Sequence, residues 1–215
     1  MENNRKMSEE KKRCSWCRPD SASYVQYHDT EWGVPVTEDD KLFQMLVLEG
    51  MQAGLSWLTI LKKRQAFLEA FDNFDPSIVA AYDGGKLDEL LQNTAIIRNR
   101  RKIESAVKNA RVVLQLQREY GSFSQYLWRF VDFKPIRNSV AEPGEIPAKT
   151  ELSTEISKDL KKRGMNFVGP TIIYALMQAV GMVNDHETSC FRYSECSRSA
   201  RESGKAGKFM ENNTN

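Results

Sequence analysis

The sequence predicts an all-α protein, and three observations support this prediction. Apolar residues recur at the spacing of one helix face through most of residues 37–181. The alternation of apolar and polar residues that marks a half-buried strand is absent over any useful length. The 215 residues, 40% of them hydrophobic and 28% charged, suffice for one packed domain. We therefore expect a single all-α domain of two helical lobes over residues 14–196, between mobile tails at 1–13 and 197–215.

The first predicted helix follows residues 37–40, where a threonine and three acidic side chains are typical of a helix start. In this helix Leu42, Met45, Leu46 and Glu49 share one face, which should point inward. A buried ionised carboxylate is costly unless a partner pairs with it. Glu49 therefore has two interpretations: it lies at a frayed helix end and reaches water, or it lines a pocket and hydrogen-bonds a ligand there.

The remaining predicted elements are also helices. Serine, aspartate and proline mark their first turns, and glycines mark their ends. The expected ranges are 57–71 with Ser56 as cap, from 76 to a break at Gly84-Gly85 with Asp75 as cap, 86–92, 100–120 ending before Gly121, 122–130, 153–163 and 170–181. Residues 132–150 contain three prolines and no clear period, so we expect a surface loop there.

The net charge of +2 is unevenly distributed along the chain. Each expected tail carries +2, so the residues between them carry −2, and a nucleic acid would have to bind through local basic patches. The charged N-terminus lacks the apolar segment of a secretory signal, and no apolar run approaches the ~20 residues of a membrane span. The expected compartment is reducing, which favours thiols or metal ligands over disulfides for the four cysteines.

The two histidines of the chain each have a cysteine nearby in the sequence. His186 precedes Cys190 by four residues, and His28 follows Cys14. Zinc binds tetrahedral sets of cysteine and histidine, and i, i+4 spacing places two ligands on one face. Cys17, which forms a Cys-x-x-Cys pair with Cys14, offers a second ligand set in which it replaces His28. A third interpretation is that all these residues are ordinary core or surface residues.

Residues 160–171 have the pattern of a helix, a tight turn and a second helix. Gly164 can end the first helix in the left-handed conformation, and Gly169 before a proline suits the start of the second. The first N–H groups of the second helix, with Lys161, Lys162 and Arg163 nearby, could bind a DNA phosphate. Basic runs at 62–64 and 98–102 favour this interpretation, although a plain helical hairpin with a solvated basic end explains the same residues.

Four segments carry a specific combination of residues. They are Cys14-Ser15-Trp16, Tyr24-x-x-Tyr27-His28-Asp29-x-Glu31-Trp32-Gly33-Val34-Pro35, Leu48-Glu49-Gly50-x-Gln52-Ala53-Gly54-Leu55-Ser56-Trp57, and Gly164-x-x-Phe167-Val168-Gly169 followed by Val183-Asn184-Asp185-His186. In this order they resemble the DNA-3-methyladenine glycosylase I family over about residues 13–190. The resemblance implies a fold of the helix-hairpin-helix DNA glycosylase superfamily, with a structural zinc site that joins the N- and C-terminal segments.

The resemblance also implies roles for individual residues. The single zinc ion would be bound by Cys14, His28, His186 and Cys190. Catalysis would involve Glu49 and Tyr27, and the base would contact Tyr24, Trp57, Trp16 and Trp32. DNA would contact Gly164, Phe167, Gly169, Thr171, Lys162 and Leu55. Cys17 lies outside the family's ligand set and leaves the fourth ligand open. Ala95 and Asn99 stand where many members have glycine and histidine, so we place no function on that turn.

The implied reaction is hydrolysis of the N-glycosidic bond of 3-methyladenine in alkylated double-stranded DNA, which releases the flipped base and leaves an abasic site. Methylation at N3 places positive charge on the adenine, which makes it a good leaving group. Aromatic faces bind such a cation, and Glu49 would accept hydrogen bonds from its amino edge. No lysine falls on a matched pocket position, so we expect a monofunctional enzyme without lyase activity. Leu55 would fill the gap that the flipped base leaves.

Two other functions fit parts of the sequence. A zinc-stabilised DNA-binding module without catalysis would share the hairpin and the metal ligands, but it gives no reason for Glu49 among aromatic residues. A small-molecule zinc hydrolase would need an open coordination position, which four protein ligands would close. The resemblance implies a monomer that needs no organic cofactor and contacts no membrane. It also implies a bacterial-type cytoplasmic protein, associated with the nucleoid through DNA.

Overall fold

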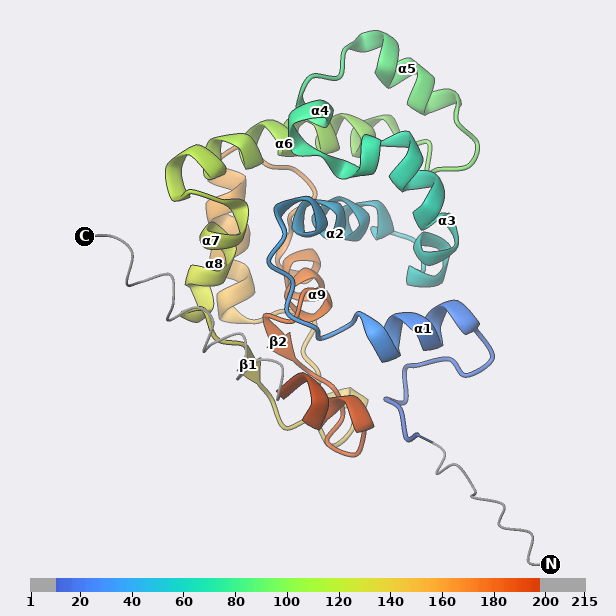
Figure 1. The fold of residues 1–215 in the computed structure, drawn as a ribbon, viewed down its shortest axis with the longest axis vertical. Coiled ribbons are helices and arrows are strands. Elements are labelled where there is room, and N and C mark those ends of the chain that lie inside the picture. Colours follow the sequence, from blue (N-terminus) through green and yellow to red (C-terminus); the bar gives the residue numbers. More distant parts are fainter. Residues whose placement is uncertain (1–10, 198–215) are drawn as a thin grey trace, which may run out of the picture.

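The computed structural model describes residues 11–197, which fold mainly into helices (Figure 1). The α-helices are α1 (Ala22–Thr30), α2 (Asp39–Gln52), α3 (Trp57–Ala70), α4 (Pro76–Ala80), α5 (Gly84–Gln92), α6 (Arg100–Tyr120), α7 (Phe123–Trp128), α8 (Glu151–Lys162) and α9 (Pro170–Ala179), and residues 191–197 form another. Short 3₁₀ turns are η1 (Asp72–Phe74), η2 (Arg129–Val131) and η3 (Pro143–Glu145). The predicted all-α class is confirmed.

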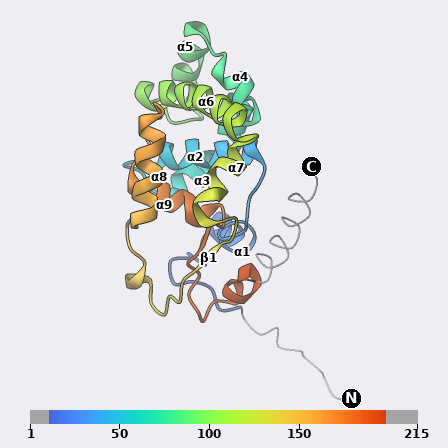
Figure 2. The same ribbon diagram turned by 90° about the vertical axis from the view of Figure 1, so that its left-hand side faces the viewer.

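Helix α2 lies in the middle of the fold and packs against α3, α6, α7 and α9 (Figures 1 and 2). Residues 42, 43 and 45–51 are all buried, so this helix is covered on nearly every side. The prediction of one inward face was therefore too narrow, because a helix that is apolar all round is buried all round. The helix continues past Glu49 to Gln52, and Glu49 is buried. The interpretation in which Glu49 reaches water at a frayed end is wrong.

Helix α6 has α4 and α5 on one side and α2 on the other (Figures 1 and 2). It spans Arg100–Tyr120 as predicted and ends at Gly121, which adopts a positive φ of 86°. The side chain of Asn99 caps its first turn by accepting a hydrogen bond from the N–H of Lys102. As the longest of these helices, α6 runs from the region near the end of α2, where Lys102 contacts Met51, to the region near the end of α8, where Glu119 pairs with Arg163.

Several predicted helix starts are confirmed and others are wrong. Ser56 and Asp75 cap α3 and α4 through their side-chain oxygens, as expected. Gly84-Gly85 forms the first turn of α5 instead of a break, because Asp83 caps the N–H of Lys86 at 2.9 Å. Helix α8 begins at residue 151, two residues before the predicted start, because a reciprocal capping box precedes it. Helix α2 begins at residue 39 without a side-chain cap.

The segment 132–150 is mostly exposed, as predicted for a surface loop, and it contains a short strand. Strand β1 (Ile136–Arg137) pairs in parallel with β2 (Val183–Asn184), and an isolated bridge joins Val140 to Glu187. These are short pairings that alternation of residue types cannot reveal. They attach the loop to the chain just before and after His186, so the loop supports one of the predicted metal ligands.

The two ends of the described chain meet on one side of the fold (Figure 1). The N–H of Phe191 donates to the carbonyl of Lys12 at 3.0 Å, and the guanidinium of Arg13 pairs with Asp29 at 2.7 Å. Residues 11–13, which we expected in a tail, thus contact the folded body. The rest of the two expected tails, residues 1–10 and 198–215, lies outside the described residues.

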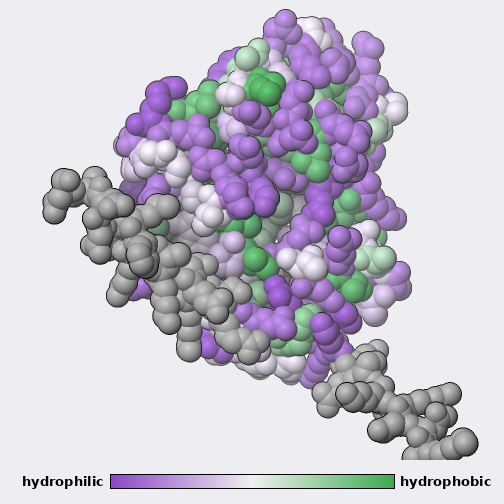
Figure 3. Space-filling view, viewed as in Figure 1, coloured by the Kyte–Doolittle hydropathy of each residue, from purple (hydrophilic) through white to green (hydrophobic). Residues whose placement is uncertain are grey.

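Hydrophilic residues cover most of the molecular face in Figure 3, and hydrophobic residues occur there singly or in small groups. Within residues 11–197, none of the helices combines the length and the apolar composition that a membrane crossing requires. This agrees with the absence of a long apolar run in the sequence.

Candidate active site and metal centre

Two cysteines and two histidines from opposite ends of the chain form one buried cluster. Their ligand atoms all lie within 4.8 Å of one another, and the four residues are Cys14, His28, His186 and Cys190. The Sγ atom of Cys14 lies 3.3 Å from Nδ1 of His186, and Sγ of Cys190 lies 3.4 Å from Nε2 of His28. This is the predicted set, and its two soft sulfur and two imidazole donors fit a tetrahedral metal ion. Cys17 is buried but lies outside the cluster.

The histidine nitrogens that do not face the sulfur atoms have their own partners. Nδ1 of His28 contacts Asp29 at 2.8 Å, and Asp29 is held in turn by Arg13. Nε2 of His186 contacts the carbonyl oxygen of Trp32 at 3.0 Å. Such outer contacts fix the ring orientation and the tautomer of metal-binding histidines. Both histidines therefore present a defined nitrogen to the cluster.

The electrostatics of the cluster favour one thiolate. The pKa of the Cys190 thiol is lowered because Cys14 donates a hydrogen bond to it and because His186 and His28 face the same sulfur atom. The pKa of the Cys14 thiol is raised, first by this interaction with Cys190 and then by burial. The cluster thus holds a charged sulfur in the interior, which a cation would stabilise. The interpretation of these residues as ordinary core residues does not explain this convergence.

A second site surrounds Glu49 near the end of α2. The side chain is 5% exposed, and burial alone raises the pKa of its carboxyl group to about 8. Tyr27 of α1 is also buried, which raises the pKa of its hydroxyl, and the nearby Glu49 raises this pKa further. Within residues 11–197, neither polar group has a hydrogen-bond partner. Buried polar groups are paired in most proteins, so unpaired ones at one place indicate a ligand site.

The predicted aromatic residues fall into two groups. The rings of Tyr27 and Trp57 lie 5.3 Å apart, and Tyr27 is close enough to Glu49 for the charge of Glu49 to act on its hydroxyl. Trp16 contacts Trp32 at 4.8 Å and Tyr24 at 6.1 Å, and it also lies 5.2 Å from the ring of His28. Trp32 contacts the ring of His186 at 4.6 Å. The second group therefore packs against the metal cluster, a role that the sequence analysis did not anticipate.

Two tryptophans have buried indole N–H groups that lack a partner among the described residues. These are the Nε1 atoms of Trp16 and Trp57. An indole N–H usually finds an acceptor when it is buried. Glu49 and Tyr27 are buried residues whose polar groups also form no hydrogen bond within residues 11–197, so a bound molecule could satisfy four polar groups in this region. The two tryptophans belong to different aromatic groups, one with Tyr27 and one against the metal cluster.

The predicted hairpin connects α8 to α9 as a tight turn. Gly164 has a φ of +103° and ends α8, while Gly169 precedes α9 without any side-chain cap for its first N–H groups. Phe167 also has a positive φ, of 53°, and a Cβ added at Gly50 would lie 3.2 Å from its Cβ. The turn therefore packs directly on α2, one residue after Glu49. Thr171 is exposed on the first turn of α9.

Only part of the basic residues expected to face DNA is free to do so. Arg64 pairs with Glu31, and Arg163 pairs with Glu119 and Asp159. Lys161 and Lys162 are exposed at the end of α8 and form no ion pair within the described chain. Among the other predicted DNA contacts, Leu55 is a large apolar residue that is 41% exposed, on the loop between α2 and α3.

The structure adds two residues of α6 to the site that the sequence analysis missed. The ammonium group of Lys102, 7% exposed, donates to the carbonyl oxygens of Met51 at 2.8 Å and Ala53 at 2.6 Å. The side-chain amide of Asn109 donates to the carbonyl of Asn166 and accepts from its N–H, both at 2.9 Å. The two residues are seven positions apart on the apolar face of α6. Their only signal in the sequence is that each is polar at a position where the pattern expects an apolar side chain.

This mainly helical fold, with the buried carboxyl group of Glu49 on α2 and a hairpin turn that packs on the same helix, is the arrangement expected of a helical DNA glycosylase. A model of the methyladenine glycosylase family matches residues 16–193. The chain belongs to this family. The family prediction from the sequence is therefore confirmed.

Individual relatives agree with the family match. The DNA-3-methyladenine glycosylase of Haemophilus influenzae is 47% identical over 178 residues, which are 83% of this chain and 96% of the relative. A crystal structure of 3-methyladenine DNA glycosylase I is 48% identical, has a TM-score of 0.81, and is matched over 84% of this chain and 98% of its own. A structure of a tyrosine-to-phenylalanine variant of another 3-methyladenine DNA glycosylase I, in complex with 3-methyladenine, is 36% identical, with a TM-score of 0.81 and coverages of 83% of this chain and 96% of its own.

Proposed function

We propose that this protein is a DNA repair glycosylase that removes 3-methyladenine from alkylated double-stranded DNA. It hydrolyses the N-glycosidic bond, releases the base and leaves an abasic site. The observation that carries the proposal is the buried carboxyl group of Glu49, which has no partner within residues 11–197, near Tyr27, whose ring lies 5.3 Å from that of Trp57. A non-catalytic DNA-binding module would have no use for this costly arrangement.

The pocket suits a base that is already a cation. Tyr27 and Trp57 offer π-faces, each worth ~0.5–2 kcal/mol to a cationic ring depending on desolvation. Glu49 accepts a hydrogen bond from the amino edge of the base, and the unpaired N–H of Trp57 donates to a ring nitrogen or to the sugar. Trp16 extends the aromatic wall, and Tyr24 and Trp32 hold Trp16 in place. Because the methylated base leaves readily, holding the cation supplies most of the catalysis.

The protonation state of Glu49 links binding to charge. With a pKa of about 8, its carboxyl group is mostly neutral at pH 7 in the free protein. A bound cation favours the carboxylate, so lesion binding lowers this pKa and releases a proton. The neutral carboxyl group is the form that the empty, desolvated pocket tolerates, and the charged form is the one that recognises the damaged base.

The test is base release from methylated duplex DNA, with duplex that contains hypoxanthine as a neutral-lesion control. We expect release of 3-methyladenine and slow or no release of hypoxanthine. Glu49→Gln should lower the rate by about 10²–10³-fold, because it removes the charge that stabilises the cation. Glu155→Gln, an exposed substitution on α8, is the matched control and should leave the rate unchanged. Full excision by Glu49→Gln would contradict the proposed role.

We further propose that the Cys14, His28, His186 and Cys190 cluster binds one structural zinc ion. Four protein ligands close the coordination sphere, which argues against a metal-bound water that attacks substrate. Metal analysis of the purified protein should give one zinc per chain, and Cys14→Ser should lose it. Cys17→Ser should retain it, since Cys17 is outside the cluster. Retention of zinc by Cys14→Ser would rule out this ligand set.

The DNA contacts form the third part of the proposal. The N–H groups at the start of α9, near Gly169 and Thr171, bind a phosphate, with Lys162 beside them. Gly164 and Phe167 shape the turn that presents these groups. Leu55 fills the gap left by the flipped base, as its exposure on the α2–α3 loop supports. Leu55→Ala should weaken binding to lesion DNA, and unchanged affinity would count against the wedge role.

The enzyme is proposed to be monofunctional. The ammonium group of Lys102, a buried lysine of α6, is engaged by two carbonyl oxygens at 2.6–2.8 Å, so it is not free to form a Schiff base. Borohydride should therefore trap no covalent enzyme–DNA complex, and the product should be an intact strand with an abasic site. A trapped complex would contradict this.

The working form is proposed to be a monomer without an organic cofactor, in the bacterial cytoplasm and associated with the nucleoid through DNA. Pocket, metal ligands and hairpin all come from one chain, which supports the monomer. Size-exclusion chromatography with light scattering of the active protein should give the mass of one chain, 24.7 kDa. A dimeric mass would refute it.

A further inference from the structure

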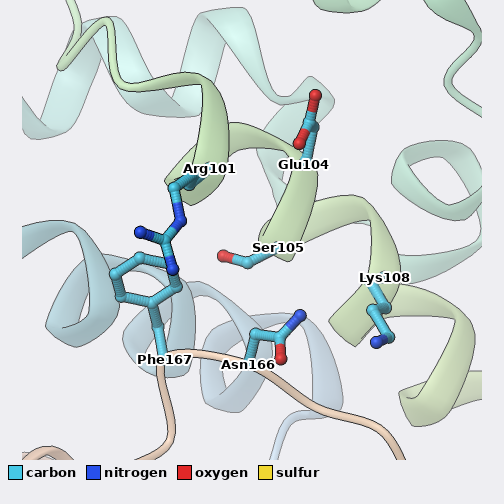
Figure 4. Close-up of a pocket in the computed structure, with 6 residues that line it drawn as sticks. All are labelled: Arg101, Glu104, Ser105, Lys108, Asn166 and Phe167. Atoms are coloured by element: carbon cyan, nitrogen blue, oxygen red, sulfur yellow. The ribbon is translucent and has the colours of Figure 1, made fainter.

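A polar groove lies between α6 and the hairpin turn, outside the base pocket. Its volume is about 480 Å³, and its lining residues are Arg101, Glu104, Ser105, Lys108, Asn166 and Phe167 (Figure 4). The first four come from one face of α6, and the last two come from the turn between α8 and α9. Arg101 belongs to the basic run at 98–102 noted in the sequence, but no role described so far uses this groove or its second cation, Lys108.

Arg101 and Lys108 are exposed and form no ion pair with any residue of the described chain. In this they differ from Arg64 and Arg163, whose guanidinium groups are engaged by carboxylates. The one carboxylate of the groove, Glu104, pairs with Arg100 at 3.6 Å. The groove thus keeps two uncompensated positive charges in contact with solvent, where an anion can reach them.

The position of the groove relates it to both loops that are proposed to contact DNA. At one end, a Cβ at Gly164 would lie 3.8 Å from Cε of Lys108, so this lysine is next to the hairpin turn. At the other end, Arg101 is followed by Lys102, which holds the carbonyl of Ala53 in the loop that carries Leu55. The groove therefore spans the surface between the hairpin and the proposed wedge.

We propose that this groove binds the sugar–phosphate backbone of DNA, with Arg101 and Lys108 contacting separate phosphates. The inference rests on the proposed glycosylase function and extends it. Arg101 and Lys108 are seven residues apart on α6, or roughly 10 Å along its axis. A DNA strand presents a phosphate every ~3.4 Å of axial rise. One small anion cannot contact both cations at this separation, whereas a backbone with successive phosphates can.

The role of the groove is to fix the register of the duplex between its two other contacts. The hairpin holds one phosphate and the α2–α3 loop approaches the lesion, so a strand that joins them passes over α6. Phosphate contacts of this kind position a protein on DNA without reading its sequence. The hydrogen bonds of Lys102 and Asn109 hold the α2–α3 loop and the hairpin turn at a fixed distance from the groove.

The test compares two double variants that remove the same charge. Arg101→Gln/Lys108→Gln alters the proposed groove. Lys149→Gln/Lys158→Gln alters a different polar groove of about 440 Å³ at the start of α8, which also contains two exposed lysines. Affinity for undamaged duplex is measured over a series of salt concentrations, and excision of 3-methyladenine is measured separately on methylated duplex.

Each lost phosphate contact reduces the slope of log affinity against log salt by about 0.9 for duplex DNA. We expect the slope of Arg101→Gln/Lys108→Gln to fall by about 1.8 relative to wild type, together with a higher KM for excision. The Lys149→Gln/Lys158→Gln slope and its excision kinetics should remain at the wild-type values. Circular dichroism of each variant establishes that both are folded.

Equal slopes for both variants and wild type would overturn the proposal, as would equal losses in the two variants, which would reflect bulk charge. Inorganic phosphate provides a further arm at constant ionic strength. If it binds wild type but not Arg101→Gln/Lys108→Gln while the DNA slope stays unchanged, the groove takes a free anion and the proposal fails. Since the slopes use undamaged DNA, they are informative whether or not excision is observed, and absence of excision in wild type refutes only the glycosylase function.

Discussion

The side chain of Glu49 serves the proposed function, but its burial lowers the stability of the fold. Its pKa of about 8 in the fold lies far above the value of ~4.3 that a free glutamate has. Between these two pH values the folded protein binds more protons than the unfolded chain, so stability falls as pH rises. Below about pH 4 both states are protonated and the burial cost disappears. The charge that recognises the lesion is therefore the charge that destabilises the empty pocket.

This linkage gives a prediction at the residue scale. Glu49→Gln should raise the free energy of unfolding relative to wild type, and the gain should grow by about 4 kcal/mol between pH 5 and pH 9. Urea denaturation of both proteins at pH 5 and pH 9 gives the gain in unfolding free energy at each pH. Subtracting one gain from the other removes the effect of the other titrating groups, which both proteins share. A gain that is the same at pH 5 and pH 9 would show that Glu49 is not buried in its neutral form.

At the scale of elements, the C-terminal end of α2 is stabilised by a lysine from another helix. The last carbonyl groups of a helix lack partners within the helix, and Lys102 of α6 satisfies those of Met51 and Ala53. This end of α2 leads into the loop with Leu55 and then into α3 with Trp57. Lys102 does not contact the base in the proposed mechanism. It is a positioning residue, because it holds the loop between Glu49 and Trp57, which are both proposed to contact the base.

Lys102→Met should leave both carbonyl groups without a donor and lower the free energy of unfolding by about 1–3 kcal/mol. Urea denaturation measures this loss, and Lys102→Arg should recover part of it because it restores N–H donors. Lys63→Met is the matched control, since Lys63 donates to the carbonyls of Thr94 and Ala95 at a more exposed site. A larger loss in the control would contradict the assignment.

A second prediction at this scale concerns the crossing between the segment after α9 and the segment before α2. Gly181 has a φ of +71°, and a Cβ there would lie 2.4 Å from backbone atoms of Val34 and Pro35. Gly181→Ala should therefore cost more than the ~1–2 kcal/mol of left-handed strain alone. Gly121→Ala isolates that strain, because its φ is +86° and no described atom lies within 4 Å of its added Cβ. Equal losses in urea would refute the close approach.

At the scale of the whole molecule, the metal cluster brings the N- and C-terminal parts of the chain together. Cys14 and His28 come from its N-terminal part, and His186 and Cys190 come from its C-terminal part. Trp16 packs against the ring of His28 and Trp32 packs against the ring of His186, so the cluster also holds these two aromatic residues in place. A metal at this position would stabilise the arrangement of the pocket without contacting substrate.

Metal removal should therefore destabilise the whole protein. Structural zinc contributes several kcal/mol to folding, and 1 kcal/mol changes Tm by about 2–4 °C in a chain of this size. We expect a strong chelator to lower the Tm of wild type by at least ~10 °C, as measured by calorimetry. Cys14→Ser should already have the lower Tm and should not respond to chelator, whereas Cys17→Ser should respond like wild type. An equal response of Cys14→Ser and wild type would contradict a zinc site at this cluster.

The sequence by itself determined what depends on local patterns. Capping by Ser56 and Asp75, the extent of α6 and the all-helical class follow from residues that lie next to one another. The resemblance of ordered motifs also identified the family and the four residues of the buried cluster.

Only the tertiary structure decided which distant side chains meet. It separated Trp16 and Trp32 from the rings beside Glu49, and it showed that Lys102 and Asn109 hold the backbone of other elements. The sequence does not reveal such contacts because burial and pairing are set by elements that are dozens of residues apart. The physical reason is that a carboxyl or ammonium group has the same sequence signature in water and in a core, while the packing around it fixes its partners and its charge.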